Sequence, residues 1–422
     1  MQSIDGVNRG IMIWNKGSKI HNPCLGYTCK AGFQCFNKGP GKRECFDPAT
    51  GTYSWVRYLT RFAGYMGNAA PQDGSPTASR FDRPTGIISI PEWSNALLVS
   101  EESGLLRRVE LDGTVSTFAG NTAGSGTSVD GTGTAATFDN PGMFARANDG
   151  TVYMTEQCKV RQINVLTGEI TTLAGTGGAG GYVDGAAAAV KFNMTKLGEN
   201  IFSDSAGGIA VAPDQQSVVI ADTYNHVLRL VNRGNGTTST LAGTGTPEPA
   251  LQTTGGIGTA AYITQPVSLL TENNGIYIGC IEGKSVKHID MDTRLVSYLS
   301  QHFDDSGVYK HKYWDTTLAI TSLAVNVRVL YFTQSALGRQ HDSISFSDHD
   351  LLRKFDTTTL TMKTEAGAFP AIANSNYVCA LREGLAEDAQ MCQVWGATTV
   401  GTTVYYVDKG LGGIGKLWWA HE

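Results

Sequence analysis

The stretch Val115-Ser-Thr-Phe-Ala-Gly120 recurs in related forms along this 422-residue chain. Two close copies are Ile170-Thr-Thr-Leu-Ala-Gly175 and Ser239-Thr-Leu-Ala-Gly243, and more divergent copies end at positions 64, 300 and 367. Successive copies end 55 to 68 residues apart, and so regular a spacing indicates an internal repeat. Leucine-rich and paired-helix repeats do not have this period.

Each period predicts the same series of short strands. In the period that ends at Gly243, strands are expected at 207–212, 217–221, 227–231 and 238–242, with turn-forming residues between them. A four-stranded meander repeated at this spacing is typical of a propeller blade. We therefore predict an all-β fold, in which residues 53–422 form a six-bladed β-propeller with four strands in each blade.

The two ends of the repeat region complement each other. The chain enters on a closing phrase at residues 59–64, before any complete repeat, and it leaves after Lys416-Leu-Trp-Trp-Ala420, which has the pattern of a third strand with no fourth. We expect residues 58–63 to supply the outermost strand of the last blade, beside inner strands at 398–400, 404–407 and 416–420. This N-terminal strand would close the ring and cover an exposed sheet edge.

One motif carries a resemblance to a known family. Ala221-Asp-Thr-Tyr-Asn225-His226-Val-Leu228-Arg229 resembles the motif of NHL-repeat β-propellers, in which an Asp, an Asn-His pair and a following Leu or Ile with Arg lie at the turn between the second and third strands. Partial versions occur at 99–107 and 155–161. The resemblance implies that His226 packs and hydrogen-bonds within its blade. It also implies that the propeller serves as a platform for interactions with other molecules. Some six-bladed propellers of this family are zinc-dependent amidating lyases, which makes an enzyme the alternative.

Composition and charge narrow the possible partners. The net charge is -5 and only 17% of residues are charged, so the chain lacks the basic surface that a phosphate backbone requires, and we expect no nucleic-acid partner. No apolar run is long enough to cross a bilayer, so no membrane span is expected. The 51 glycines favour tight turns and short strands.

Cysteine spacing predicts disulfides and an extracellular location. The eight cysteines are Cys24, Cys29, Cys35 and Cys45, within 22 residues, and the dispersed Cys158, Cys280, Cys379 and Cys392. The cluster lacks the paired Cys-x-x-Cys spacing of a zinc site, so disulfides are expected there rather than a metal. Disulfides persist in oxidising compartments, which indicates a secreted protein.

The clustered cysteines define a small module at residues 22–48. It resembles a reduced EGF-like or follistatin-type unit, with four cysteines where an EGF domain carries six. Four cysteines allow three connectivities, and the alternating pairing typical of compact loops predicts Cys24 with Cys35 and Cys29 with Cys45. We also expect Cys379 to pair with Cys392. Cys158 and Cys280 are expected to lie too far apart to pair with each other, which leaves them free, buried or paired outside the chain.

No catalytic, cofactor-binding or metal site is predicted. Apart from His226, the histidines at 21, 288, 302, 311, 341, 349 and 421 show no paired spacing. Three Asp-Gly pairs, Asp73-Gly74, Asp130-Gly131 and Asp184-Gly185, are interpreted as tight turns, with calcium ligands as the alternative. The acidic stretches at 304–305 and 348–350 are interpreted as solvated loop charges.

Two further features indicate glycosylation and contacts with other molecules. Asn193-Met-Thr195 and Asn235-Gly-Thr237 are glycosylation sequons. In the N-terminal extension, residues 1–21, the apolar tract Ile11, Met12, Ile13 and Trp14 has no repeat to pack into. We interpret this tract as a contact to another protein or another copy, with packing on its own propeller as the alternative.

These features predict an extracellular, non-enzymatic binding or assembly protein without a cofactor, as a structural subunit of an extracellular (glyco)protein assembly. Its partners would be proteins, including copies of itself, and glycans. Two alternatives remain at this stage: a propeller enzyme of the amidating-lyase or lactonase type, and the ligand-binding ectodomain of a larger receptor. Metal analysis would separate the enzyme from the binding protein.

Overall fold

The computed structural model describes residues 34–39, 42–47, 52–54, 56–64, 70–178, 180–194, 207–248, 255–280, 285–300, 318–326, 329–336, 350–356, 361–366, 384–385, 391 and 394–420. Side chains are described for 58–64, 70–178, 180–194, 207–248, 255–280, 286–298, 391 and 394–418. The chain divides into two compact units, Met1–Val56 with Trp419–Glu422, and Arg57–Trp418. Within the described part, no helix has the length and hydropathy needed to span a membrane.

The smaller unit contains one antiparallel sheet in the order β1-β2-β3, made of β1 (Gln34–Gly39), β2 (Lys42–Asp47) and β3 (Thr52–Ser54). The backbone register of β1 and β2 places Cys35 opposite Cys45. Cys24, Cys29 and the apolar tract at residues 11–14 lie outside the described residues. The predicted disulfide pairing therefore stays a prediction.

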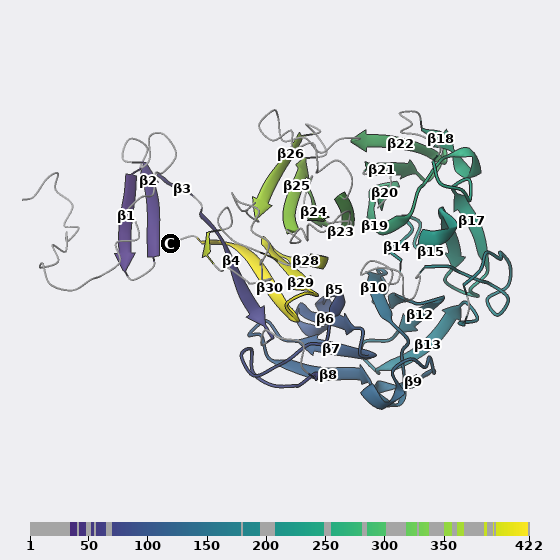
Figure 1. The fold of residues 1–422 in the computed structure, drawn as a ribbon, viewed down its shortest axis with the longest axis horizontal. Coiled ribbons are helices and arrows are strands. Elements are labelled where there is room, and N and C mark those ends of the chain that lie inside the picture. Colours follow the sequence, from purple (N-terminus) through teal and green to yellow (C-terminus); the bar gives the residue numbers. More distant parts are fainter. Residues whose placement is uncertain are drawn as a thin grey trace, which may run out of the picture. The chain divides into compact units, whose positions relative to one another are not determined.

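The larger unit consists of antiparallel meanders, each named here by its innermost strand (Figure 1). The β5 blade contains β5 (Pro84–Ile90), β6 (Ala96–Glu101), β7 (Leu105–Val109) and β8 (Val115–Gly120). The β10 blade contains β10 (Pro141–Arg146), β11 (Val152–Glu156), β12 (Lys159–Ile163), β13 (Glu169–Ala174) and β9 (Gly131–Thr132). The β14 blade contains β14 (Ile209–Val211), β15 (Ser217–Asp222), β16 (Val227–Asn232) and β17 (Thr238–Ala242).

The remaining sheets continue the same pattern. The β19 blade contains β19 (Pro266–Glu272), β20 (Gly275–Cys280), β21 (Ser285–Asp290), β22 (Leu295–Ser300) and β18 (Gly256–Ile257). The β28 blade contains β28 (Val394–Val400), β29 (Thr403–Asp408), β30 (Gly413–Ala420), β4 (Val56–Ala63) and β27 (Gly384–Leu385). A further sheet contains β23 (Leu318–Asn326), β24 (Val329–Ala336), β25 (Asp350–Asp356) and β26 (Thr361–Ala366). Short 3-10 helices are η1 (Pro91–Trp93), η2 (Thr122–Gly124), η3 (Gly133–Ala135), η4 (Thr223–Asn225) and η5 (Gly258–Ala260).

The all-β propeller class is therefore correct. The innermost strands β28, β5, β10, β14 and β19 lie side by side in that order. Packing is described for the five blades built on these strands, whereas the β23–β26 sheet is described by its backbone alone. The structure thus shows five blades with their side chains, and the predicted six-blade count stays a proposal that depends on the remaining sheet.

The N-terminal strand has the position expected from the sequence. The order β27-β4-β30-β29-β28 places β4 beside β30, so a strand from the start of the propeller completes the sheet formed by its last strands. Leu59 and Ala63 of β4 are fully buried, which explains why this segment is apolar. The short strand β27 on the outer side of β4 had no signal in the sequence.

The expectation of four strands in each blade was incomplete. In the β10 and β19 blades, β9 and β18 add a fifth strand outside the outermost one. In the β5 and β14 blades, single bridges do the same, from Gly74 to Val115 and from Gly185 to Thr238. These segments precede the innermost strand in sequence, and they cover an edge that would otherwise expose unpaired backbone groups.

The hydrophobic core lies between neighbouring blades. Each described interface is an apolar layer, with Val99 and Tyr405 between the β5 and β28 blades, Leu98 and Met154 between the β5 and β10 blades, and Val219 and Ile278 between the β14 and β19 blades. A blade is thus covered on both faces. This explains why β6 is buried along its whole length and shows a continuous apolar run rather than alternation.

Candidate functional site

Three blades contain an arginine buried beside a carboxylate. The carboxylate ends the second strand of its blade and the arginine lies on the third, in the pairs Glu101 with Arg107, Glu156 with Arg161, and Asp222 with Arg229. In each case the arginine is opposite the residue two positions before the acid, so both side chains are on the same face of the sheet. All six side chains are at most 1% exposed.

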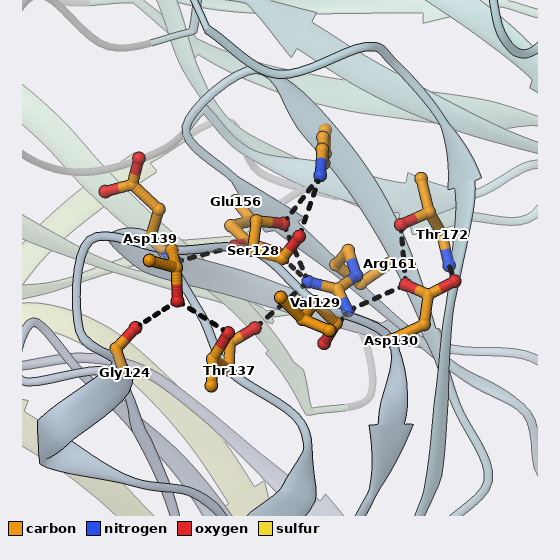
Figure 2. A network of polar contacts seen from close by, with 11 residues as sticks. Gly124, Ser128, Val129, Asp130, Thr137, Asp139, Glu156, Arg161 and Thr172 are labelled. Atoms are coloured by element: carbon orange, nitrogen blue, oxygen red, sulfur yellow. Dashed lines mark hydrogen bonds and ion pairs between the residues drawn. The ribbon is translucent and has the colours of Figure 1, made fainter.

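Figure 2 shows this cluster in the β10 blade. The Arg161 guanidinium forms an ion pair with Glu156, and its Nη2 also donates to Asp130 Oδ1 at 3.0 Å and to the Val129 carbonyl at 3.1 Å. Asp130 in turn accepts from the Thr172 hydroxyl at 2.8 Å. One arginine therefore joins three parts of its blade. These are the second strand, the segment that leads into β9 and, through Asp130, the outermost strand β13.

The β14 blade repeats this geometry. Arg229 binds Asp222 at 2.7 Å and Asp184 at 2.6 Å, and it donates to the Val183 carbonyl at 2.8 Å. Asp184 accepts from the Thr240 hydroxyl at 3.0 Å, as Asp130 does from Thr172.

The β5 blade has the same cluster. Arg107 binds Glu101 at 2.6 Å and Asp73 at 2.7 Å. Asp73 accepts from the Thr117 hydroxyl at 3.0 Å. The aspartates of the three Asp-Gly pairs are therefore ligands of a buried arginine, which neither the turn interpretation nor the calcium interpretation anticipated.

An aromatic ring completes each cluster. The guanidinium carbons of Arg107, Arg161 and Arg229 lie 5.4, 5.4 and 5.2 Å from the ring centroids of Phe81, Phe138 and Phe192, respectively. At this distance a cation is attracted to the face of the ring. Each cluster thus consists of the arginine, the buried acid, the aspartate of the Asp-Gly pair and the phenylalanine that precedes the innermost strand.

The local electrostatics differ between the buried and the half-exposed acids. Burial raises the pKa of Glu101 to about 7, an effect that the nearby Arg107 opposes. Burial raises the pKa of Glu156 and Asp222 in the same way. For the half-exposed Asp73, burial again favours a higher pKa, but hydrogen bonds from Thr117 and Arg107 outweigh it and the pKa is lowered. Each arginine has all these acceptors within its own blade. The clusters therefore hold the strands of one blade together, and we call each of them a clamp.

The β19 blade carries a variant of the clamp. Lys287 takes the arginine position, and its Nζ donates to the Tyr262 carbonyl at 2.8 Å and lies 3.5 Å from Glu248. Cys280 takes the position of the acid. The carboxylate near the lysine, Glu248, therefore comes from a different segment than in the other blades. Glu248 also accepts from the Tyr298 hydroxyl at 2.5 Å.

The two dispersed cysteines within the described part are free. Cys158 and Cys280 are both buried, and burial raises the pKa of each thiol to about 11. Both thiols are therefore protonated at neutral pH and act as small apolar groups. Cys379 and Cys392 lie outside the described residues, so their pairing stays a prediction.

His226 makes the kind of contact expected of a structural residue. It adopts φ of 55° at the end of η4, and its Nδ1 accepts from the Gln265 amide at 3.2 Å, which links the β14 blade to the segment before β19. The neighbouring Asn225 donates to Asp222 at 2.9 Å. Among the residues with described placement, no group of three or more His, Cys, Asp or Glu side chains is arranged to hold a metal ion.

Hydroxyl groups link adjacent blades near their innermost strands. Thr85 and Ser100 of the β5 blade donate to the carbonyls of Pro141 and Gly142 in the β10 blade, at 2.8 and 2.7 Å. Thr223 of the β14 blade donates to the carbonyl of Pro266 in the β19 blade at 2.7 Å. Sequence reasoning missed these residues, because a lone Ser or Thr at a strand end carries no distinctive signal.

The two sequons differ in their surroundings. Asn235 is exposed in the turn between β16 and β17. Asn193 is half-buried, its backbone N–H donates to Asp222 Oδ1 at 2.7 Å, and its side chain packs against Gly180. The acidic stretches at 304–305 and 348–349 lie outside the described residues.

These features define the larger unit as an all-β propeller in which a buried Arg or Lys holds together each of the β5, β10, β14 and β19 blades. No protein-family model matches the chain. In sequence it is 28% identical over 200 residues to protein SUPPRESSOR OF QUENCHING 1, chloroplastic, of Arabidopsis thaliana, and 27% identical over 184 residues to NHL repeat-containing protein 2 of Bos taurus. The matches cover 45% and 41% of this chain but only 18% and 24% of those proteins.

Solved structures with the same fold include a protein of unknown function and an auxiliary nutrient binding protein, both from Bacteroides thetaiotaomicron. Their TM-scores are 0.57 and 0.54 at 15% and 12% identity, and the matches cover 90% and 92% of this chain and 80% and 89% of those chains. At this identity the likeness shows the fold alone. Together the comparisons support the resemblance to NHL-repeat propellers, and they give no support to an EGF-like module at residues 22–48.

Proposed function

We propose that this chain is an extracellular, non-enzymatic binding and assembly protein that uses a propeller as its scaffold. One observation carries the proposal: the charged side chains that recur from blade to blade are paired within their own blades, with each arginine fully buried, whereas large apolar side chains are exposed on edge segments and outer turns. Among the described residues these are Leu111, Val129, Leu166, Tyr182, Val183, Ile257 and Leu295. Exposed apolar groups on a rigid scaffold favour contacts with other proteins.

The location rests on the chemistry of the sequence. Four cysteines within 22 residues and two sequons favour an oxidising, glycan-bearing compartment. The resemblance to NHL-repeat propellers favours an interaction platform. A structural subunit that contacts protein partners, including further copies of the chain, combines these features.

Two measurements test the proposal. The protein purified from its source should elute as a particle several times the mass of one chain, and it should hydrolyse neither lactones nor esters, with or without added Ca²⁺ or Zn²⁺. Turnover that depends on either metal would favour the lactonase or lyase alternative. Free thiols at the four clustered cysteines of the isolated protein would contradict the extracellular location.

We further propose that the β23–β26 sheet is the sixth blade. Its innermost strand β23 lies next to β19 on one side and β28 on the other, the two neighbours that a closed ring requires. The sheet order β23-β24-β25-β26 is the same meander as in the other blades. An experimental density map of the propeller tests this count, and a gap between the β19 and β28 blades would contradict it.

A further inference from the structure

The outer edge of the β19 blade carries an apolar pair. Ile257 of β18 lies directly opposite Leu295 of β22, and the two residues are 63% and 44% exposed. At the same register in the β10 blade, Thr132 of β9 lies opposite Glu169 of β13. The surrounding sequences are nearly identical, since Gly256-Ile-Gly-Thr-Ala260 corresponds to Gly131-Thr-Gly-Thr-Ala135. One blade thus presents apolar side chains where its counterpart presents polar ones.

The backbone at this edge is short. β18 has two residues, of which Gly256 lies opposite Val296 of β22, while Ile257 is the N-cap of η5 and its carbonyl accepts the first bond of that helix. A partner therefore meets this edge through the side chains of the apolar pair rather than through a new strand.

The charged residues just before Leu295 have a net negative charge. Asp290 ends β21 and Asp292 lies in the turn that follows, together with one cation, Arg294, directly before Leu295. Asp292 is exposed and accepts from Asn274 at 2.6 Å, and the Asp290 carboxylate accepts from the backbone of its own turn. A partner with apolar side chains flanked by cations fits this surface.

The chain itself contains a segment of that chemistry. The apolar tract Ile11, Met12, Ile13 and Trp14 is flanked by Arg9 and Lys16, with no acid between them. Its four large apolar residues in succession supply apolar side chains on both faces of an extended strand.

We propose that the apolar tract of a second copy packs against the outer edge of the β19 blade and covers Ile257 and Leu295. This inference rests on the proposed assembly function and names the contact that would produce it. The two surfaces are different, so the contact is heterologous, and repetition from copy to copy builds a ring or a filament.

The experiment measures the mass of the full chain by sedimentation velocity from about 1 to 100 µM, a range that brackets the micromolar affinity of a small interface. Ile257→Thr copies Thr132 of the β10 blade and should weaken self-association at least tenfold. Trp14→Ser should do the same from the other side of the contact. Leu166→Thr, at an exposed apolar residue of a different blade, is the matched control and should leave association unchanged. Unchanged melting of Ile257→Thr would show that the blade is intact.

A synthetic peptide of residues 5–19 gives an independent readout. It should dissociate the parent assembly and bind the Ile257→Thr chain at least tenfold more weakly. If Trp14→Ser dissociates the assembly but Ile257→Thr does not, the edge of the β19 blade is not the docking site, while the assembly function stands. Equal weakening by Leu166→Thr would mean unspecific apolar association and would overturn the inference. A parent chain that stays monomeric across the range would overturn both this contact and the assembly function.

Discussion

Arg161 illustrates how single residues hold a blade together. Its guanidinium meets a buried acid, a half-exposed acid, a carbonyl and an aromatic ring, all within the β10 blade. Removal of one partner from a buried ion pair leaves the other charge without compensation, which costs about 3 to 5 kcal/mol. We expect Arg161→Ala to lower the free energy of unfolding by this amount, and Arg161→Lys to lower it by less, because the charge stays but the planar fork is lost.

Chemical denaturation of the variants checks this prediction. The double variant Glu156→Leu with Arg161→Met should recover most of the loss, because no charge is then left buried. Arg108→Ala serves as the control, since its ion pair with Glu110 is partly exposed and should contribute about 1 kcal/mol or less. A loss in Arg108→Ala equal to that in Arg161→Ala would contradict the special role of the buried clamp.

The sequons give a second prediction at the residue scale. When the chain is secreted from a eukaryotic host through an added leader, Asn235 should carry a glycan and Asn193 should not. Asn235 is exposed in a turn, whereas Asn193 is half-buried, with its backbone N–H bonded to Asp222 and its side chain packed against Gly180. Peptide mapping after enzymatic removal of glycans reports the occupancy of each site, and Asn235→Gln is the control. Equal occupancy of the two sites would count against the prediction.

At the scale of elements, the segments that pair with the outermost strands explain the role of the Asp-Gly pairs. The glycine pairs with the outermost strand and the aspartate reaches the arginine on the neighbouring strand. A short stretch before each innermost strand therefore both covers an edge and clamps the blade. The sequence pattern showed a turn, because turn chemistry is local, whereas the arginine partner is 45 residues away in the case of Asp184.

The register of β1 and β2 leads to a prediction about disulfides. Directly opposite residues of antiparallel strands have Cα atoms about 4.5 to 5.5 Å apart, within the range that a disulfide spans. We therefore expect Cys35 to pair with Cys45, which leaves Cys24 for Cys29. Non-reducing peptide mapping decides between this connectivity and the alternating one expected from the loop spacing. Recovery of a peptide that links Cys24 to Cys35 would refute the register-based pairing.

At the scale of the whole molecule, the closure of the β28 blade by β4 should control stability. Deletion of residues 1–64 removes the buried Leu59, Phe62 and Ala63, whereas deletion of residues 1–51 leaves β4 in place. We expect the first deletion to lower the melting temperature by about 10 °C or more, from loss of several kcal/mol of apolar burial. The second should change it little. Equal melting of the two deletion variants would show that β4 does not close the ring.

The sequence by itself determined the repeat, the propeller class and the closing strand. These features depend on patterns within a few tens of residues, such as the phrase that ends at Gly120 and the unmatched copy at residues 59–64. Apolar runs and turn residues report strands directly, because backbone hydrogen bonding and burial act on neighbouring residues in the chain.

Only the tertiary structure decided which polar residues work together. Asp130 was interpreted as a turn residue, apart from the partial NHL motif that contains Glu156 and Arg161, and the bonds of Thr85 and Ser100 to the next blade were not expected. The contact of Asp130 with Arg161 joins residues 31 positions apart, and the bonds of Thr85 and Ser100 join different blades. In both cases the partner depends on how strands and sheets pack rather than on spacing in the sequence. The same reason applies to Ile257: its exposure at a sheet edge follows from its place in the β19 blade, since the sequence around it matches a stretch whose surface is polar.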